Sequence, residues 1–221
     1  MKNKILRLIV LILLSQQFVI AQNDYKHSVL NKSNFLNPLA KFSNEWNKEV
    51  YSKCNTAKDL KYLSNTEQDV IWILNMVRQN PVLFLNSVML DSKSDVFKTP
   101  KERSSYYNSL VADLKILTPN QKPLMPDSNL FVSAKCHAYE SGKTGYVGHD
   151  RKKNACIEDF YGECCYYGLE DPFVVVISLL IDEKIRSLGH RKIMLSKAFS
   201  FIGVSTQSHI DYGTNTVLDF K

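Results

Sequence analysis

The order of the expected elements predicts an α+β fold or a three-layer α/β/α sandwich rather than a doubly wound parallel sheet. Helical patterns fill the middle of the chain. Strand-like runs come only at its end, at Phe199–Thr206 and Thr216–Phe220, around a turn at Tyr212-Gly213. Because strands and helices do not alternate, the βαβ units of a doubly wound sheet are not indicated.

The first 21 residues have the pattern of a secretory signal peptide. A positively charged start precedes the apolar run Leu8–Leu14, and the small residues Val19 and Ala21 precede Gln22. The apolar run is shorter than the roughly 20 residues that a membrane-spanning helix needs. We therefore expect a secreted or periplasmic protein that is cleaved after Ala21 and is not transmembrane once the signal is removed.

The expected cleavage changes the charge balance. The 221 residues include 28 Lys and Arg and 22 Asp and Glu, a net charge of +6. Residues 1–21 hold three of the basic residues and no acidic ones. Cleavage therefore leaves 25 basic and 22 acidic residues, a net charge of +3. Such a weak field predicts no nucleic-acid partner, and we expect the short basic run Arg151–Lys153 to be a solvated loop. The hydrophobic content of 44% suits a buried core.

The chain after the signal divides into a polar N-terminal extension, residues 22–60, and one domain, residues 61–221. The extension has no sustained period and is expected to be a mobile arm or a wrapping segment. The domain opens with a helix whose expected N-cap is Thr66 and whose apolar stripe begins at Val70. Pro81 ends this helix or begins the next one.

Later helices follow from periodicity and capping residues. They are expected at Pro81–Leu90, Ser104–Leu117, Pro126–Gly142 and Phe173–Ile181, and a break at Gly189 precedes the short segment His190–Leu195. Asp127 or Ser128 is the expected N-cap of the third, and the fourth is expected to run on to about Arg186. Gly142–Gly168, with five glycines, is expected to be a long functional loop.

Five cysteines follow the expected signal peptide. They are Cys54, Cys136, Cys156, Cys164 and Cys165. Export permits disulfides, and an odd count leaves at least one thiol free or paired between chains. We favour a bridge from Cys156 to Cys164 or Cys165, because it would staple the expected loop; buried free thiols are the alternative.

Three residues in glycine-rich settings are candidates for chemistry. The chain has no Gly-x-Ser-x-Gly elbow, no His-Glu-x-x-His, no phosphate loop and no dinucleotide fingerprint. What remains is His149, Glu163 and His190, each beside a glycine. Two imidazoles and a carboxylate can hold Zn²⁺ with a water ligand, or shuttle a proton. Their spacing is no local metal motif, so solvated loop residues are the alternative interpretation.

Several segments resemble the CAP superfamily (cysteine-rich secretory protein, antigen five and pathogenesis-related one) in its bacterial SCP-like form. The matching segments, in chain order, are EQDVIWILNMVRQNP, LMPDSNLFVSAKCHA, GYVGHD, GE, LGHRKIML and FIGVS. The resemblance implies an α/β/α sandwich with a central cleft lined by two histidines and two glutamates, where Zn²⁺ or another divalent cation can bind. Carried over, it implies that His149, Glu163 and His190 line the cleft and are metal ligands.

The second glutamate of the family has no clear match here. Asp182 and Glu183 are the acidic candidates before His190, and they lie closer to it than in eukaryotic members. The resemblance therefore implies an incomplete site, with Asp182 and His209 as weaker candidates. Asp182 is otherwise expected to pair with Arg186 or Arg191.

Other residues have simpler expected roles. We expect His137 to be a packed or half-exposed helix residue and His209 to be exposed near the hairpin turn, where it could still reach the rim of the cleft. Three tyrosines could stack on sugars or peptide, or cover the core: Tyr161, Tyr166 and Tyr167.

Two functions from different classes are expected. The first is a binding or interaction module for an extracytoplasmic protein, peptide, glycan or lipid, without turnover. The alternative is a Zn-dependent hydrolase of peptide or cell-envelope substrates, with Glu163 as ligand or general base. Lipid or sterol carriage follows from family analogy alone.

Overall fold

The computed structural model describes residues 37–91, 104–151, 156 and 159–221. The expected signal peptide and the first part of the expected extension lie outside these ranges. The described helices are η1 (Asn44–Asn47, 3-10), α2 (Glu49–Ser52), α3 (Asn65–Gln79), α4 (Pro81–Phe84), η2 (Leu85–Met89, π), α5 (Ser105–Ile116), α6 (Ser128–Thr144), α7 (Pro172–Ile181) and α8 (Gly189–Leu195). The described strands are β1 (Met125–Pro126), β2 (Gly162–Gly168), β3 (Phe201–His209) and β4 (Gly213–Phe220).

The strands form one mixed sheet in the order β1-β3-β4-β2. β1 runs parallel to β3, and the other two pairings are antiparallel. The predicted α+β class is confirmed. The prediction of a loop throughout Gly142–Gly168 is wrong, because Gly162–Gly168 is the edge strand β2, paired with β4 along its whole length. Local composition suggested a loop, and the hydrogen bonds to a distant partner decide for a strand.

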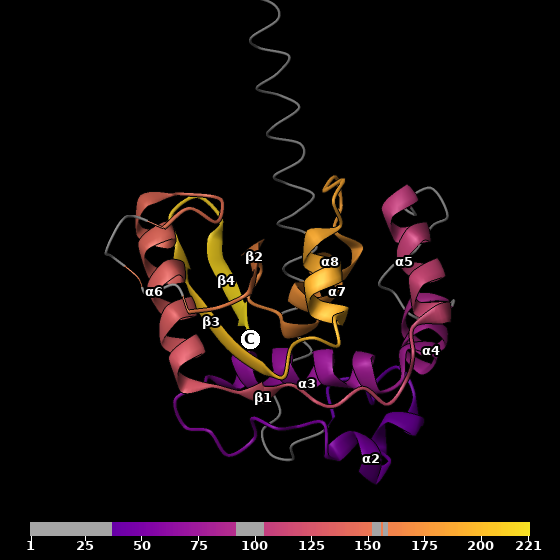
Figure 1. The fold of residues 1–221 in the computed structure, drawn as a ribbon. Coiled ribbons are helices and arrows are strands. Elements are labelled where there is room, and N and C mark those ends of the chain that lie inside the picture. The colour runs from indigo at the N-terminus through magenta and orange to yellow at the C-terminus, as the bar shows by residue number, and fades with distance from the viewer. Residues whose placement is uncertain (1–36, 92–103, 152–155, 157–158) are drawn as a thin grey trace, which may run out of the picture. The chain divides into compact units, whose positions relative to one another are not determined.

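Helices lie against both faces of the sheet, with α6 on one side and α7 and α8 on the other (Figure 1). Cys164 and Leu218 point into the main hydrophobic core, while their neighbours Cys165 and Val217 pack against alanines of α6. This alternation follows from the two-residue period of a strand. It decides which β2 side chains can meet α6.

Close packing of α6 on the sheet depends on glycine. An ideal Cβ on Gly203 of β3 would lie 2.1 Å from the backbone carbon of Leu130. A Cβ on Gly142 would lie 1.9 Å from the Ser208 carbonyl oxygen. The predicted end of α6 at Gly142 is therefore wrong: this glycine permits close packing, and the helix ends before Gly145, which has φ of 72°.

Two other helix ends differ from the predictions. Ser64, not Thr66, is the N-cap of α3, and it forms a capping box with Glu67. α7 stops at Ile181 because Asp182 takes a left-handed conformation with φ of 59°, so the helix does not run on to Arg186. Of the two expected N-caps of α6, Asp127 and Ser128, the structure has Asp127.

Part of the expected N-terminal extension belongs to the packed unit. Leu39, Trp46 and Ala57 are fully buried in the main core. This agrees with a wrapping segment for the described part of residues 22–60. No helix in the described ranges is long and apolar enough to cross a membrane.

The disulfide joins Cys136 and Cys156, whose Cα atoms lie 5.6 Å apart. The favoured bridge from Cys156 to Cys164 or Cys165 is wrong. Both β2 cysteines are buried free thiols on opposite faces of the sheet, whereas Cys136 lies on α6. The free-thiol alternative holds for these two and for Cys54.

Candidate functional site

The imidazole rings of His149 and His190 lie close together, with centroids 5.8 Å apart and planes at 43°. We call them the histidine pair. His149 follows α6, in the segment after Gly148, and His190 is in the first turn of α8. Each ring has a carboxylate at its Nδ1 atom: Glu163 Oε1 at 2.9 Å from His149, and Asp182 Oδ1 at 2.8 Å from His190.

Asp182 holds the start of α8 as well as the His190 ring. Its other oxygen, Oδ2, accepts hydrogen bonds from the backbone N–H groups of His190 at 3.0 Å and Arg191 at 3.4 Å. The expected side-chain partners are therefore wrong, since the Arg191 guanidinium bonds Asp113 at 2.9 Å. Glu183 is exposed and bonds Ser104 instead.

Glu163 is buried, and both of its oxygens are engaged. Oε1 meets His149, and Oε2 accepts from the Arg151 guanidinium. Burial by itself raises the pKa of Glu163. The His149 hydrogen bond and the Arg151 charge together lower this pKa by more than burial raises it, so it lies below its usual value. The same hydrogen bond raises the pKa of His149.

Arg151 lies at the centre of a buried polar cluster. Its guanidinium also contacts Asp219 Oδ2 at 3.1 Å and the backbone and side-chain oxygens of Ser133 at 3.0 Å each. The side chain is 1% exposed, so the expectation of a solvated loop is wrong for Arg151. Its partners come from three different elements, which local sequence cannot reveal. Burial raises the pKa of Asp219 to about 7.

Glu163 also belongs to a second group of potential metal ligands, which is buried. His137, Glu163 and Cys165 are all buried, and their ligand atoms lie within 4.8 Å of one another. We call them the inner group; it could hold a metal ion. His137 Nε2 lies 3.9 Å from Glu163 Oε1, and Cys165 Sγ lies 3.6 Å from Nδ1 of His149. Burial raises the pKa of the Cys165 thiol well above its usual value.

The sequence interpretation did not assign His137 or Cys165 to a site. His137 is packed, as expected, with 2% of its surface exposed. Glu163 and Cys165 are two residues apart, and on a strand this spacing places both side chains on one face. That signal was hidden because the segment was expected to be a loop.

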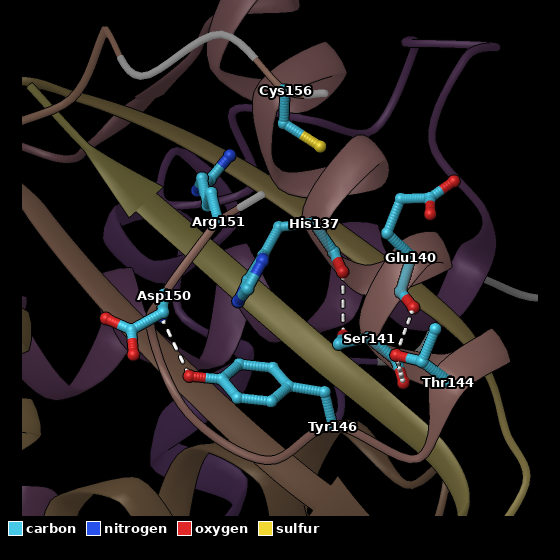
Figure 2. Close-up of a pocket in the computed structure, with 8 residues that line it drawn as sticks. All are labelled: His137, Glu140, Ser141, Thr144, Tyr146, Asp150, Arg151 and Cys156. Carbon is cyan, nitrogen blue, oxygen red and sulfur yellow. Dashed lines mark hydrogen bonds between the residues drawn. The ribbon is translucent and has the colours of Figure 1, made fainter. Parts of the chain in front are cut away.

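A pocket of about 450 Å³ lies beside the inner group (Figure 2). Figure 2 shows the His137 ring between Arg151 and Tyr146 in the wall of the pocket. The remaining lining residues are Glu140, Ser141, Thr144, Asp150 and Cys156. The pocket therefore gives solvent a route towards His137.

His209 and two tyrosines form a separate aromatic cluster. The His209 ring lies 5.3 Å from the ring of Tyr167 and 5.2 Å from that of Tyr212. His209 is 3% exposed, so its expected exposure is wrong. The Tyr167 hydroxyl accepts from the Gly148 N–H at 3.0 Å, which fixes the segment that carries His149.

The fold and the site together define a class of protein: an α+β domain in which two histidines are hydrogen-bonded to carboxylates, next to a buried group of His, Glu and Cys. The chain matches no protein-family model and no curated protein.

Proposed function

We propose that this protein is an exported binding module of the CAP/SCP type, in which His149 and His190 hold one divalent cation such as Zn²⁺. Its domain would have the three-layer α/β/α sandwich of that family. One observation carries the proposal: both Nδ1 atoms of the histidine pair are engaged by carboxylates, at 2.9 and 2.8 Å.

This arrangement suits metal binding through the other ring nitrogen. A metal-binding histidine commonly donates its second N–H to a carboxylate, which fixes the tautomer and the ring orientation. Here that leaves Nε2 of each ring to face a cation. Two imidazoles bound to one Zn²⁺ at about 2.0–2.1 Å have centroids roughly 5–6 Å apart. The observed 5.8 Å fits this requirement.

The resemblance described above adds support from the chain order. Its segments GYVGHD, GE and LGHRKIML supply His149, Glu163 and His190, and these residues come together in space. Helices against both faces of the sheet agree with the sandwich of the family. We propose that Asp182 takes the part of the second family glutamate, although it lies closer to His190 along the chain.

The contacts of Glu163 favour binding over hydrolysis. A general base must reach the proton that it removes. Both oxygens of Glu163 already accept hydrogen bonds, and its side chain is 4% exposed. A cation held by only two protein ligands has open positions. A carboxylate or carbonyl oxygen of an extracytoplasmic partner would fill them.

Calorimetric titration with Zn²⁺ at pH 7 tests the proposal. We expect a Zn²⁺ site at the histidine pair, so His190→Ala should bind one Zn²⁺ fewer per chain than the wild-type protein. Asp182→Asn should weaken binding by about 10–100-fold, because it removes the group that orients His190. The matched control is Glu183→Gln, an exposed neighbour whose substitution should leave affinity unchanged.

Absence of stoichiometric Zn²⁺, or unchanged affinity in His190→Ala, would refute the metal site. Hydrolysis of peptide or cell-envelope material that disappears in both His149→Ala and His190→Ala would favour the hydrolase instead. Unfolding curves of the same variants show whether a lost signal reflects lost structure.

A further inference from the structure

We infer that His137, Glu163 and Cys165 form a second, buried metal centre with one sulfur, one nitrogen and one oxygen ligand. This centre is distinct from the histidine pair, since neither His190 nor Asp182 belongs to it. Its chemistry points to a borderline-soft cation such as Zn²⁺, which accepts thiolate, imidazole and carboxylate ligands together.

The distances fit such a centre after small adjustments. In a tetrahedral zinc site with bonds of about 2.0–2.3 Å, ligand atoms lie roughly 3.3–3.6 Å apart. His137 Nε2 and Glu163 Oε1 are 3.9 Å apart, and all three ligand atoms lie within 4.8 Å of one another. The ligand atoms need to close in by at most about 1.5 Å, which rotation of the buried side chains can supply.

His149 lies next to the fourth position. Its Nδ1 atom is 3.6 Å from Cys165 Sγ and 2.9 Å from Glu163 Oε1. A cation in the inner group would meet this nitrogen only while the histidine pair is empty; when the pair holds its own cation, His149 Nδ1 keeps its proton and a water takes the fourth position. The first alternative gives a closed structural site, and the second gives one open position.

The Gly148 carbonyl keeps a hydrogen-bond donor when His137 turns to a metal. His137 Nε2 now donates to the Gly148 carbonyl at 3.0 Å and would have to release it. The Tyr167 hydroxyl already donates to the same carbonyl at 3.4 Å, so this oxygen keeps a donor after His137 has turned away. His137 would bind as the neutral tautomer with its proton on Nδ1. The Cys165 thiol would release its proton to solvent on binding.

The pocket reaches one of the three ligands. His137 lines the pocket of about 450 Å³, and Figure 2 shows its ring facing that space. Two acidic residues, Glu140 and Asp150, and one basic residue, Arg151, line the same pocket, so its net charge is negative and favours an approaching cation. The centre would tie α6 to β2 and hold the segment between them that carries His149.

Titration of the full chain with Co²⁺ tests this centre. Only thiolate ligation gives a sulfur-to-cobalt charge-transfer band in the near ultraviolet. The titration is anaerobic and without reductant, so that the Cys136–Cys156 bridge stays intact. We expect the band to reach the absorbance of one thiolate-bound Co²⁺ per chain, to vanish in Cys165→Ser, and to need at least tenfold more Co²⁺ in His137→Gln.

Two controls separate this centre from other sites. The double variant Cys54→Ala with Cys164→Ala keeps Cys165 as its single thiol outside the disulfide. It should retain the band, and it gives a result even if Cys165→Ser does not fold. His190→Ala should also retain the band while losing any cation held by the histidine pair.

No band in the folded wild-type protein, or a band that persists in folded Cys165→Ser, overturns the inference. Cobalt bound without the band and lost in His190→Ala would support the histidine pair alone. The two proposals therefore fail in distinguishable ways.

Discussion

Glu163 and Asp219 lie opposite each other on β2 and β4, and the guanidinium of Arg151 contacts both carboxylates. All three side chains are buried, with exposed fractions of 4% or less. One arginine therefore compensates two acidic groups at the place where α6, β2 and β4 meet. Burial raises the pKa of Asp219 to about 7, so this carboxyl is protonated in part of the molecules near neutral pH.

Removing Arg151 should strongly destabilise the fold. Arg151→Met keeps much of the side-chain volume and leaves Glu163 and Asp219 buried without their cation. Breaking one side of a buried ion pair costs about 3–5 kcal/mol. Urea unfolding measures the loss. Lys53→Ala, which breaks the exposed pair with Glu49, is the control and should cost less than about 1 kcal/mol. A similarly small cost for Arg151→Met would show that the ion pairs of Arg151 with Glu163 and Asp219 do not stabilise the fold.

Glu163→Gln should lower the pKa of His149. The hydrogen bond from His149 to Glu163 raises this pKa, because the carboxylate stabilises the protonated ring. The isosteric amide removes the charge, so deprotonation should occur at lower pH. A titration of the His149 ring signals by NMR checks the direction. Glu140→Gln, in the wall of the pocket, is the control; an unchanged His149 pKa in Glu163→Gln would count against this hydrogen bond.

Asp69→Asn should make the protein more stable at neutral pH. Burial and the nearby Asp171 raise the pKa of Asp69 from 3.8 to about 6. Between these values the folded state binds more protons than the unfolded state, so this carboxyl makes stability fall as pH rises from about 4 to 6. For a half-buried group the gain should be about 1–2 kcal/mol at pH 7 and absent at pH 3.

Denaturant unfolding of Asp69→Asn and the wild-type protein at several pH values measures this difference. Asp59→Asn changes an exposed carboxyl and should leave the pH dependence as it is. Parallel curves for Asp69→Asn and the wild-type protein would argue against the raised pKa.

The Cys136–Cys156 bridge should be detectable by mass and by stability. Alkylation of the unfolded chain should label three thiols without reduction and five after it. The double variant Cys136→Ser with Cys156→Ser should lose about 3 kcal/mol, because a closed loop of this length restricts the unfolded state. A disulfide-linked peptide that contains Cys164 or Cys165 would instead restore the bridge expected from sequence.

Gly203→Ala should disrupt the packing of α6 on the sheet. Its Cβ would lie 2.1 Å from the backbone of Leu130, which cannot yield unless the helix moves. We expect a loss of about 3 kcal/mol or more in the free energy of unfolding. Gly189→Ala is the matched control, since its Cβ would meet only the Ser187 hydroxyl oxygen at 3.4 Å. Equal stability of the two variants would show that α6 is free to shift.

Much of the fold could be predicted from the sequence. The apolar periodicity of α3, the Asp127 cap of α6 and the terminal hairpin are local patterns, and the structure has all three. The strand β2 could not be predicted in the same way. Its glycines and polar residues favour a loop, and only pairing with β4 makes them a strand.

The sequence by itself selected His149, Glu163 and His190, because each lies beside a glycine in a short motif. Tertiary structure alone decided their partners: Asp182 at His190, Arg151 at Glu163, and His137 and Cys165 behind them. The reason is physical. Capping and periodicity act between residues a few positions apart, whereas strand register and helix packing set which distant side chains are buried together.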